Sequence, residues 1–332
     1  MKYKVILFVS FILVSVIASF IVWGKGPNSL TGSRVVTIAR GQSAWSIGQT
    51  LKNQGVIRNV ITFFALSTAK GFSGQLKAGT YRFEAGQDLS DILRTLNEGD
   101  GLTITLIIPE GASVKEIEDR LSQNGKQVSF NKVDWDKLGQ KYSFIIEAVT
   151  IENNFVGEGY LFPDTYELEF SALADSIAGK MIDNFSRKVS PFFEEIKEKG
   201  LSLREVVIVA SLIEREVKLD RDRALVSDII WRRLKAGMPL QIDATIVYAK
   251  VADGQEKKPP TKADLGILSP YNTYLHMGLP PGAIANPGLG SLEAALKSKN
   301  NEFWYYLSKS DGSIVYSRTL EEHNLAKAKY LR

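Results

Sequence analysis

The sequence predicts an α+β protein with three parts: an N-terminal transmembrane helix, a small α+β subdomain, and a larger mixed α+β domain built around a buried helix. Three observations predict this class: an uncharged apolar run near the N-terminus, a repeated strand–glycine–helix pattern, and a nearly all-apolar helix in the second half of the 332 residues. The expected boundaries are 1–24 for the transmembrane anchor, 25–34 for a linker, 35–102 for the small subdomain, 103–150 for a connecting α+β subdomain and 151–332 for the large domain.

The apolar run Val5–Trp23 contains no charge and is close to the ~20 residues that a membrane-spanning helix needs. Lys2 and Lys4 precede it, which favours a cytoplasmic N-terminus, and Trp23 stands where an interfacial aromatic residue is expected. A cleaved signal peptide is the alternative, with small residues at Ala18–Ser19. The run exceeds the ~7–15 residues of a typical signal core and lacks a clear cleavage site, so an uncleaved single-pass anchor is favoured. The chain after Trp23 is then expected outside the cytoplasm, at the plasma membrane.

Composition narrows the chemistry. The net charge of +4 is spread along the chain, without the clustered Lys and Arg typical of nucleic-acid binding, so no nucleic acid is expected as a partner. Cysteine is absent, and the two histidines, His276 and His323, are not in a metal-binding spacing. No metal or organic cofactor is therefore implied. Carboxylate chemistry, or no chemistry at all, remains.

The strand–glycine–helix pattern occurs three times between residues 35 and 121. In each copy a β-rich run precedes a glycine, and apolar residues follow that glycine at offsets +6 and +10, the spacing of one helix face: Gly41, Ile47, Leu51; Gly86, Ile92, Leu96; Gly111, Ile117, Leu121. The expected helix caps are Ser43, Asp88 or Ser90, and Ser113.

Residues 35–97 resemble the LysM module, a small βααβ fold that binds polymers containing N-acetylglucosamine. The segments Gln54–Ile57 and Lys77–Tyr81 fit the body of that module. The resemblance implies that this LysM-like subdomain binds glycan. The alternative is that a capped helix after a strand is generic α+β structure and that the region acts as a spacer.

Beyond a boundary expected over 125–150, the sequence predicts two long helices, 171–198 and 203–236, followed after Gly237 by ordered loops and short strands rich in Pro, Gly, Asn and Tyr. Loops on a helical scaffold are where binding residues usually gather. The second helix carries the buried segment, because Val206–Ile213 is apolar apart from Ser211.

Glu214 interrupts this apolar run. It lies on the same helical stripe as Val207 and Ala210, at the edge of a desolvated region. Desolvation should raise the pKa of such a carboxyl from ~4.3 toward ~6, as a general acid requires. The alternative is that the helix leaves the core here and that Glu214 forms a weak surface pair with Lys218.

The string ASLIERE, Ala210–Glu216, resembles the A-S-x-x-E-x-E signature of the endolytic murein transglycosylase family, the MltG-like or YceG-like proteins. Further segments match in family order: EGYLFPDTYEL from Glu158, WRRLKAGMPLQIDATIVYA from Trp231, PYNTYLHMGLPPGAIANPG from Pro270, and EHN from Glu322. Two departures stand out. Asp243-Ala244-Thr245 replaces Asp-Pro-Thr, and Gly312–Tyr316 lacks the histidine of Gly-x-His-x-Phe.

The resemblance implies an endolytic lytic transglycosylase that cleaves the bond between N-acetylmuramic acid and N-acetylglucosamine in nascent peptidoglycan, near the plasma membrane and alongside peptidoglycan synthases. In this reading Glu214 is the catalytic residue. It protonates the glycosidic oxygen, then acts as base toward the C6 hydroxyl, which leaves a 1,6-anhydro end. The residues expected to bind substrate are Glu158, Gln241, Asp243, Tyr271, Asn272, Thr273 and Tyr274.

Two other readings remain open. A non-catalytic peptidoglycan-binding scaffold would keep the fold without activity; the missing histidine favours it and Glu214 argues against it. A conventional hydrolase would use Glu158, Glu216 or Asp243 as a second carboxylate.

Overall fold

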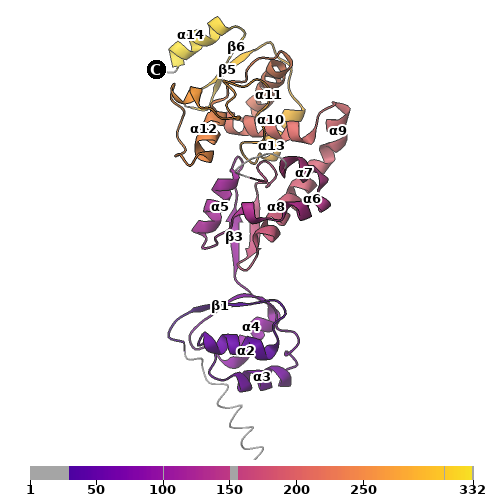
Figure 1. Ribbon diagram of the computed structural model, residues 1–332, viewed down its shortest axis with the longest axis vertical. Helices are drawn as coiled ribbons and strands as arrows, with labels where there is room; N and C mark the ends of the chain where they lie inside the picture. The colour runs from indigo at the N-terminus through magenta and orange to yellow at the C-terminus, as the bar shows by residue number, and fades with distance from the viewer. Residues whose placement is uncertain (1–29, 100, 150–155, 310, 331–332) are drawn as a thin grey trace, which may run out of the picture. The chain divides into compact units, whose positions relative to one another are not determined.

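The computed structural model describes residues 30–99, 101–149, 156–309 and 311–330 (Figure 1). The chain divides into two compact units. The first comprises Met1–Thr105 with Glu167–Ala172, and the second comprises Leu106–Tyr166 with Leu173–Arg332. A connecting subdomain was expected over 103–150; its described residues from Leu106 onward belong to the second unit, together with the segment that carries Glu214.

The predicted fold class needs correction, because it included a transmembrane helix. The run Val5–Trp23 on which that prediction rested lies outside the described residues. Within the four described ranges, no helix combines the length and the apolar character needed to cross a membrane. The fold class that the structure supports is mixed α+β.

The first unit contains a two-stranded antiparallel sheet, in which Val36 of one strand lies opposite Tyr81 of the other. Its elements in chain order are β1 (Arg34–Ile38), α2 (Ala44–Asn53), α3 (Val60–Ala69), β2 (Gly79–Phe83) and α4 (Leu89–Glu98). The apolar residues of the repeat, such as Ile47 and Leu96, are buried in one core. Ser43 caps α2 as expected, and Asp88 rather than Ser90 caps α4, in a reciprocal capping box with Asp91.

Strands β3 (Thr103–Ile107) and β4 (Thr165–Glu169) form a second two-stranded sheet. Helix α5 (Val114–Gln123) follows β3 and begins with a capping box between Ser113 and Glu116. The helices that follow in the second unit are α6 (Trp135–Lys141), α7 (Ser143–Val149), α8 (Ala174–Val189) and α9 (Phe193–Glu198).

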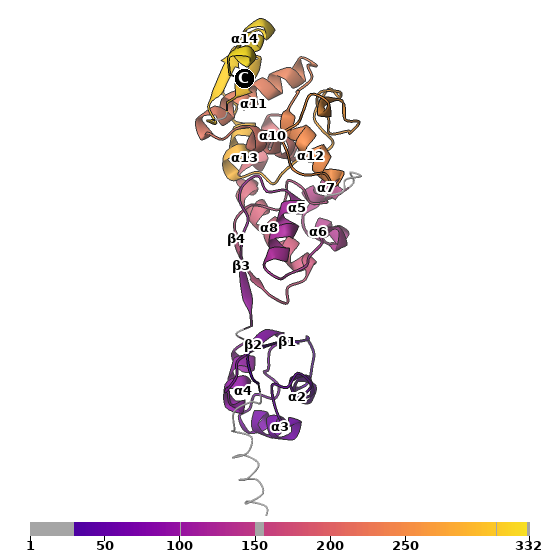
Figure 2. The same ribbon diagram turned by 90° about the vertical axis from the view of Figure 1, so that its left-hand side faces the viewer.

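Helix α10 (Leu203–Glu216) lies among the other elements of this unit, packed against α7, α9, α11, α12 and α13 (Figures 1 and 2). Every residue from Val206 to Ile213 is buried, so the helix is enclosed nearly all round. Ser202 and Glu205 form its capping box. The Ser211 hydroxyl accepts a hydrogen bond from Ile284 N at 3.1 Å, which joins a distant loop to the helix.

Both long helices expected from the sequence are broken. The first is interrupted by a 3-10 turn over Ser190–Phe192, where Pro191 lacks an N–H for the helical ladder. The second ends at Val217, which is extended (φ −115°, ψ 114°), and α11 (Asp220–Lys235) begins after Leu219, which is also extended. The break turns the chain directly after Glu216.

The C-terminal part supplies α12 (Asp243–Ala252), α13 (Leu289–Leu296), the antiparallel pair β5 (Tyr305–Ser308) and β6 (Ile314–Ser317), and α14 (Leu320–Tyr330). Long loops join α12 to α13 and carry the Pro-, Gly- and Asn-rich segments.

Candidate active site

The last turn of α10 presents two carboxyl groups in different directions. Glu214 and Glu216 are two residues apart, which places their side chains about 200° apart around the helix axis. Their hydrogen-bond partners come from different elements: the loop before α13 for Glu214 and the start of α12 for Glu216.

Glu214 is enclosed by partners. Its side chain is 6% exposed. One oxygen accepts a hydrogen bond from Gly288 N at 3.0 Å, and the other lies 3.5 Å from Nη2 of Arg223, on α11. Gly111, at φ +75°, packs so closely that a Cβ there would lie 3.2 Å from Glu214 Cγ. A substrate oxygen would have to displace one of these contacts in order to reach the carboxyl.

Glu110 stands beside this group. Its carboxyl lies 3.9 Å from Arg223 Nη2 and occupies the space that a Cβ on Gly288 would fill. Burial raises the pKa of Glu110, the charge of Glu214 raises it further, and Arg223 opposes both effects. Glu110, Glu214 and Arg223 thus form one charge cluster.

Glu216 has a different environment. The residue is half-buried and forms part of the wall of a cleft of about 420 Å³. One carboxyl oxygen accepts a hydrogen bond from Ala244 N at 3.2 Å, at the N-terminus of α12, where Ile242 provides no side-chain cap. Desolvation raises the pKa of Glu216 to about 7. The Ala244 hydrogen bond lowers this pKa and the charge of Asp243 raises it.

Polar and aromatic side chains from several elements complete this cleft. Six of the lining residues are polar or aromatic side chains of the kind that sugar-binding sites use: Gln241, Asp243, Tyr274, Tyr306, Arg233 and His323. The Tyr274 hydroxyl donates to Asp243 Oδ1 at 2.5 Å. Burial raises the pKa values of Tyr274 and Tyr306 above the ordinary value of 10, so both phenols remain protonated donors at neutral pH.

Arg233 and His323 are buried at the same cleft. Arg233 is 6% exposed and donates from Nε to Trp304 O and from Nη1 to Leu240 O, both at 2.8 Å. His323 stacks on Tyr305 with a centroid separation of 5.3 Å, and burial lowers its pKa to about 4. His323 is therefore neutral at pH 7.

The structure separates the residues that the sequence assigned to one site. Gln241, Asp243 and Tyr274 line the cleft with Glu216, whereas Glu214 lies with Glu110 and Arg223. Gln241 is also the one non-glycine residue with positive φ, 53°, among those described. Such strain is typical of positions held in place for a function.

Tyr271, Asn272 and Thr273 are buried, at 6%, 0% and 2% exposure, and support the cleft from behind. Asn272 donates to the carbonyls of Leu265 and Ile267, which orders the loop. The Thr273 carbonyl accepts from Gln241 N, and the Thr273 hydroxyl accepts from Ile242 N. These three residues position the segment that carries Gln241.

Glu158 is also a buried support. Its carboxyl accepts hydrogen bonds from Val114 N, at 3.1 and 3.2 Å, and from Asn286 Nδ2 at 3.0 Å. Desolvation raises its pKa to about 8, while the Val114 hydrogen bond and the charge of Arg215 lower it. Asn286 also accepts from Gly159 N and Leu161 N and donates to Ala112 O, each at 2.9 Å. Glu158 and Asn286 together connect three loops, which contain Ala112, Gly159 and Asn286.

Five residues of these sites were not singled out by the sequence: Glu110, Arg223, Arg233, Asn286 and Tyr306. Arg233 and Asn286 lie within segments that resemble the family. A polar residue within an apolar or glycine-rich string of such a segment could have marked them as candidate site residues. Glu110 follows a proline and precedes Gly111, in a Pro-Glu-Gly turn that the helical periodicity alone did not mark. Arg223 has no comparable signal.

Fold and site together define a mixed α+β protein whose cleft presents a desolvated carboxyl beside a second carboxylate and protonated tyrosines. In the ranges that the structure describes, no group of three or more His, Cys, Asp or Glu side chains is placed to hold a metal ion. The chain belongs to the YceG-like family, whose model matches residues 36–329.

Individual relatives agree with this membership. The chain is 36% identical over 307 residues to a Bacillus subtilis (strain 168) protein named endolytic murein transglycosylase, a match that covers 89% of this chain and 84% of that protein. A Streptococcus pneumoniae (D39) protein of the same name is 28% identical over 320 residues, which cover 58% of its length. A crystal structure of a yceG-like protein from Listeria monocytogenes superposes with a TM-score of 0.62 at 29% identity, covering 89% of this chain and 99% of that one.

Proposed function

We propose that this protein is an endolytic lytic transglycosylase that cleaves the bond between N-acetylmuramic acid and N-acetylglucosamine in peptidoglycan and leaves 1,6-anhydro ends. The names of the relatives support the activity. One structural observation carries the chemistry: Glu216, with a pKa raised to about 7, forms part of the wall of a polar and aromatic cleft.

The first step needs an acid. Near neutral pH a carboxyl with a pKa of about 7 is protonated in a large fraction of molecules, so Glu216 can donate its proton to the glycosidic oxygen. Asp243, held by Tyr274, places negative charge next to it. That charge both keeps the proton on Glu216 and stabilises the positive charge that develops on the sugar ring.

The second step needs a base. After proton transfer, the Glu216 carboxylate accepts the proton of the muramic acid C6 hydroxyl, whose oxygen then closes onto C1. No water is consumed, because the substrate supplies the nucleophile. A hydrolase would instead use Asp243 to activate water and would leave reducing ends. The scaffold alternative would leave no products.

The geometry favours Glu216 over Glu214 as the catalytic group. The family signature contains both glutamates, and from the sequence Glu214, the first of them, was predicted to be catalytic. Both oxygens of Glu214 are engaged, by Gly288 N and Arg223, whereas Glu216 lines a cleft together with three of the predicted substrate residues. We therefore assign substrate contact to Gln241, Asp243 and Tyr274, and positioning to Glu158 and residues 271–273.

The departure at Ala244 changes the environment of the proposed acid. A proline at this position would have no N–H, whereas Ala244 N donates to Glu216. The second departure lies in the β5–β6 hairpin, where Ile314 pairs with Ser308, a residue that lines the cleft. The family's histidine would stand at Ile314, opposite this cleft residue, so we propose that its loss affects substrate binding.

The N-terminal unit is proposed to contact the same polymer. Trp45 and Phe64, on α2 and α3, are 43% and 40% exposed and meet edge to face at 5.8 Å. Exposed aromatic rings can pack on the apolar faces of sugars. The strand–helix–helix–strand order of this unit agrees with the resemblance to LysM modules.

We further propose that the protein acts at the outer face of the plasma membrane, on nascent strands and beside the synthases that extend them. The substrate class and the sequence around Lys2, Lys4 and Val5–Trp23 support this location. A C-terminal reporter that is active only outside the cytoplasm should give signal. A cytoplasmic reporter signal would refute the location.

Mass spectrometry of products from purified peptidoglycan tests the reaction. The wild-type protein should release fragments with anhydro ends, and Glu216→Gln should release almost none. Reducing ends would identify a hydrolase, and an absence of products from folded wild-type protein would support the scaffold.

A further inference from the structure

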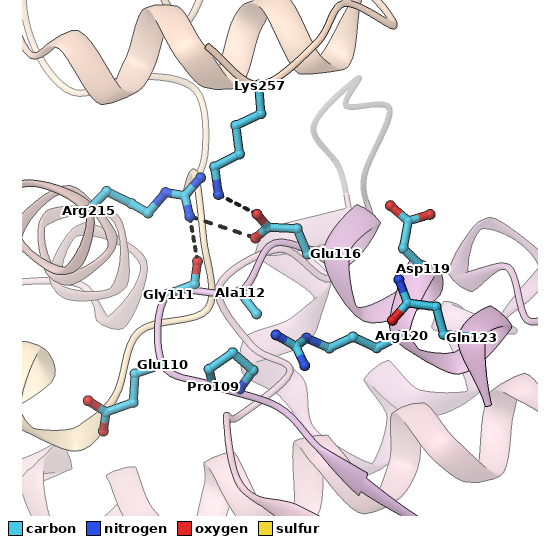
Figure 3. Close-up of a pocket in the computed structure, with 10 residues that line it drawn as sticks. All are labelled: Pro109, Glu110, Gly111, Ala112, Glu116, Asp119, Arg120, Gln123, Arg215 and Lys257. Carbon is cyan, nitrogen blue, oxygen red and sulfur yellow. Dashed lines mark hydrogen bonds and ion pairs between the residues drawn. The ribbon is translucent and has the colours of Figure 1, made fainter. Parts of the chain in front are cut away.

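A second cleft, of about 480 Å³, lies beside the end of α10 (Figure 3). Pro109–Ala112, one face of α5, Arg215 and Lys257 line it. Six of its ten lining residues are charged: Glu110, Glu116, Asp119, Arg120, Arg215 and Lys257. In contrast to the cleft at Glu216, none of the lining residues is aromatic. It therefore lacks the rings on which sugars pack, and its charges fit a ligand that carries both carboxylate and ammonium groups.

The cationic side chains converge from separate elements. Lys257, from the loop after α12, pairs with Glu116, and Arg215 Nη1 lies 3.7 Å from the other Glu116 oxygen while it donates to Gly111 O at 2.9 Å. In Figure 3 the exposed Arg120 extends from α5 across the cleft toward Pro109. Among the described residues Arg120 has no ion-pair partner, because Asp119 pairs with Lys115. Arg120 is thus available to a carboxylate.

This second cleft is a neighbour of the proposed catalytic cleft. Arg215 lines one and Glu216, the next residue of α10, lines the other. The loop after α12 is shared as well: Lys257 belongs to the second cleft, and Pro260, Thr261 and Lys262 belong to the catalytic cleft. The two clefts therefore share the end of α10 and the loop after α12.

We propose that this cleft binds the stem peptide of the glycan strand, with Arg120 and Lys257 contacting its carboxylates and Glu110 or Asp119 contacting its amine. This rests on the proposed function. In peptidoglycan the peptide branches from muramic acid, the sugar whose C6 hydroxyl closes the ring, so the branch leaves the backbone next to the catalytic carboxyl. The cleft would select strands that still carry peptides.

The test compares cleavage of peptide-bearing strands with cleavage of the same strands after an amidase has removed the peptides. Arg120→Ala should lower kcat/KM on peptide-bearing strands about two- to fivefold, the effect of one solvent-screened ion pair, through a higher KM. It should leave cleavage of stripped strands unchanged. Arg120→Glu should have a larger effect on the same substrate, Arg120→Lys should recover part of the loss, and Lys235→Ala, an exposed cation on α11 outside both clefts, should behave as wild type.

Equal losses on both substrates, or no loss on either, would overturn the peptide site. Failure of the wild-type protein to cleave stripped and peptide-bearing strands alike would instead refute the proposed function. The two failures are therefore distinguishable.

Discussion

Replacing Glu216 with glutamine is the most direct test of the proposed mechanism. The amide keeps the size of the side chain, and its oxygen can still accept from Ala244 N, so the start of α12 should be unchanged. The amide cannot donate a proton as an acid does. General acid–base assistance is worth ~10²–10⁴-fold in each step, which is about 3–5 kcal/mol of barrier. Because Glu216 serves both steps, release of anhydro products should fall by at least about a hundredfold.

The assay is the initial rate of anhydro-product release from purified peptidoglycan near pH 6.5, with circular dichroism to show that the variant is folded. Glu214→Gln is the matched control, two residues away on the same helix. Its amide can still accept a hydrogen bond from Gly288 N, but Arg223 loses a charged partner. The free energy of unfolding should therefore fall by about 1–3 kcal/mol. Activity below the melting temperature should stay within about tenfold of wild type. An inactive but folded Glu214→Gln together with an active Glu216→Gln would refute the reasoning and return catalysis to Glu214.

Three further outcomes are expected. Activity should decline above about pH 7 as Glu216 ionises, and Ala244→Pro should move that decline to higher pH in a kcat/KM profile, because it removes an N–H that stabilises the carboxylate. Because the pKa of Glu158 in the folded protein is about 8, its contribution to the free energy of unfolding should be complete below about pH 4.5 and lost as the pH rises toward 8. Glu158→Gln should flatten this pH dependence, on the order of a few kcal/mol, in urea titrations at pH 5 and 8. An unchanged pH dependence would contradict this prediction. In the inactive Glu216→Gln background, Trp45→Ala should reduce the fraction that pellets with insoluble peptidoglycan, and equal pelleting would indicate that the N-terminal unit is a spacer.

Several local features were predictable because they depend on short-range chemistry. Ser43, Asp88 and Ser113 are helix caps at positions that the sequence indicated, since a side-chain oxygen before an apolar-periodic run satisfies free N–H groups of the first turn. The burial of Val206–Ile213 followed equally from an apolar run that no exposed helix tolerates. The break at Pro191 was missed, because helical periodicity continues across that position.

The assignment of roles to carboxylates could not be completed from the sequence. Glu158 was expected to contact substrate, yet it is buried against Val114 N and Asn286, residues 44 and 128 positions away. The string ASLIERE offers two glutamates on opposite sides of one helix, and nothing local distinguishes their surroundings.

The sequence by itself determined the family, the repeat of the N-terminal unit and the apolar helix that ends in two carboxyl groups, because these depend on residue order and periodicity. Only the tertiary structure placed Glu216 in the wall of a cleft with residues remote in the chain. The break after Glu216 and the packing of α12 bring Asp243, Gln241 and Tyr274 to Glu216, while Arg223 and the Gly288 amide enclose Glu214. Desolvation and neighbouring charge set the pKa of a carboxyl, and both come from residues remote in the chain, which a helical pattern cannot specify.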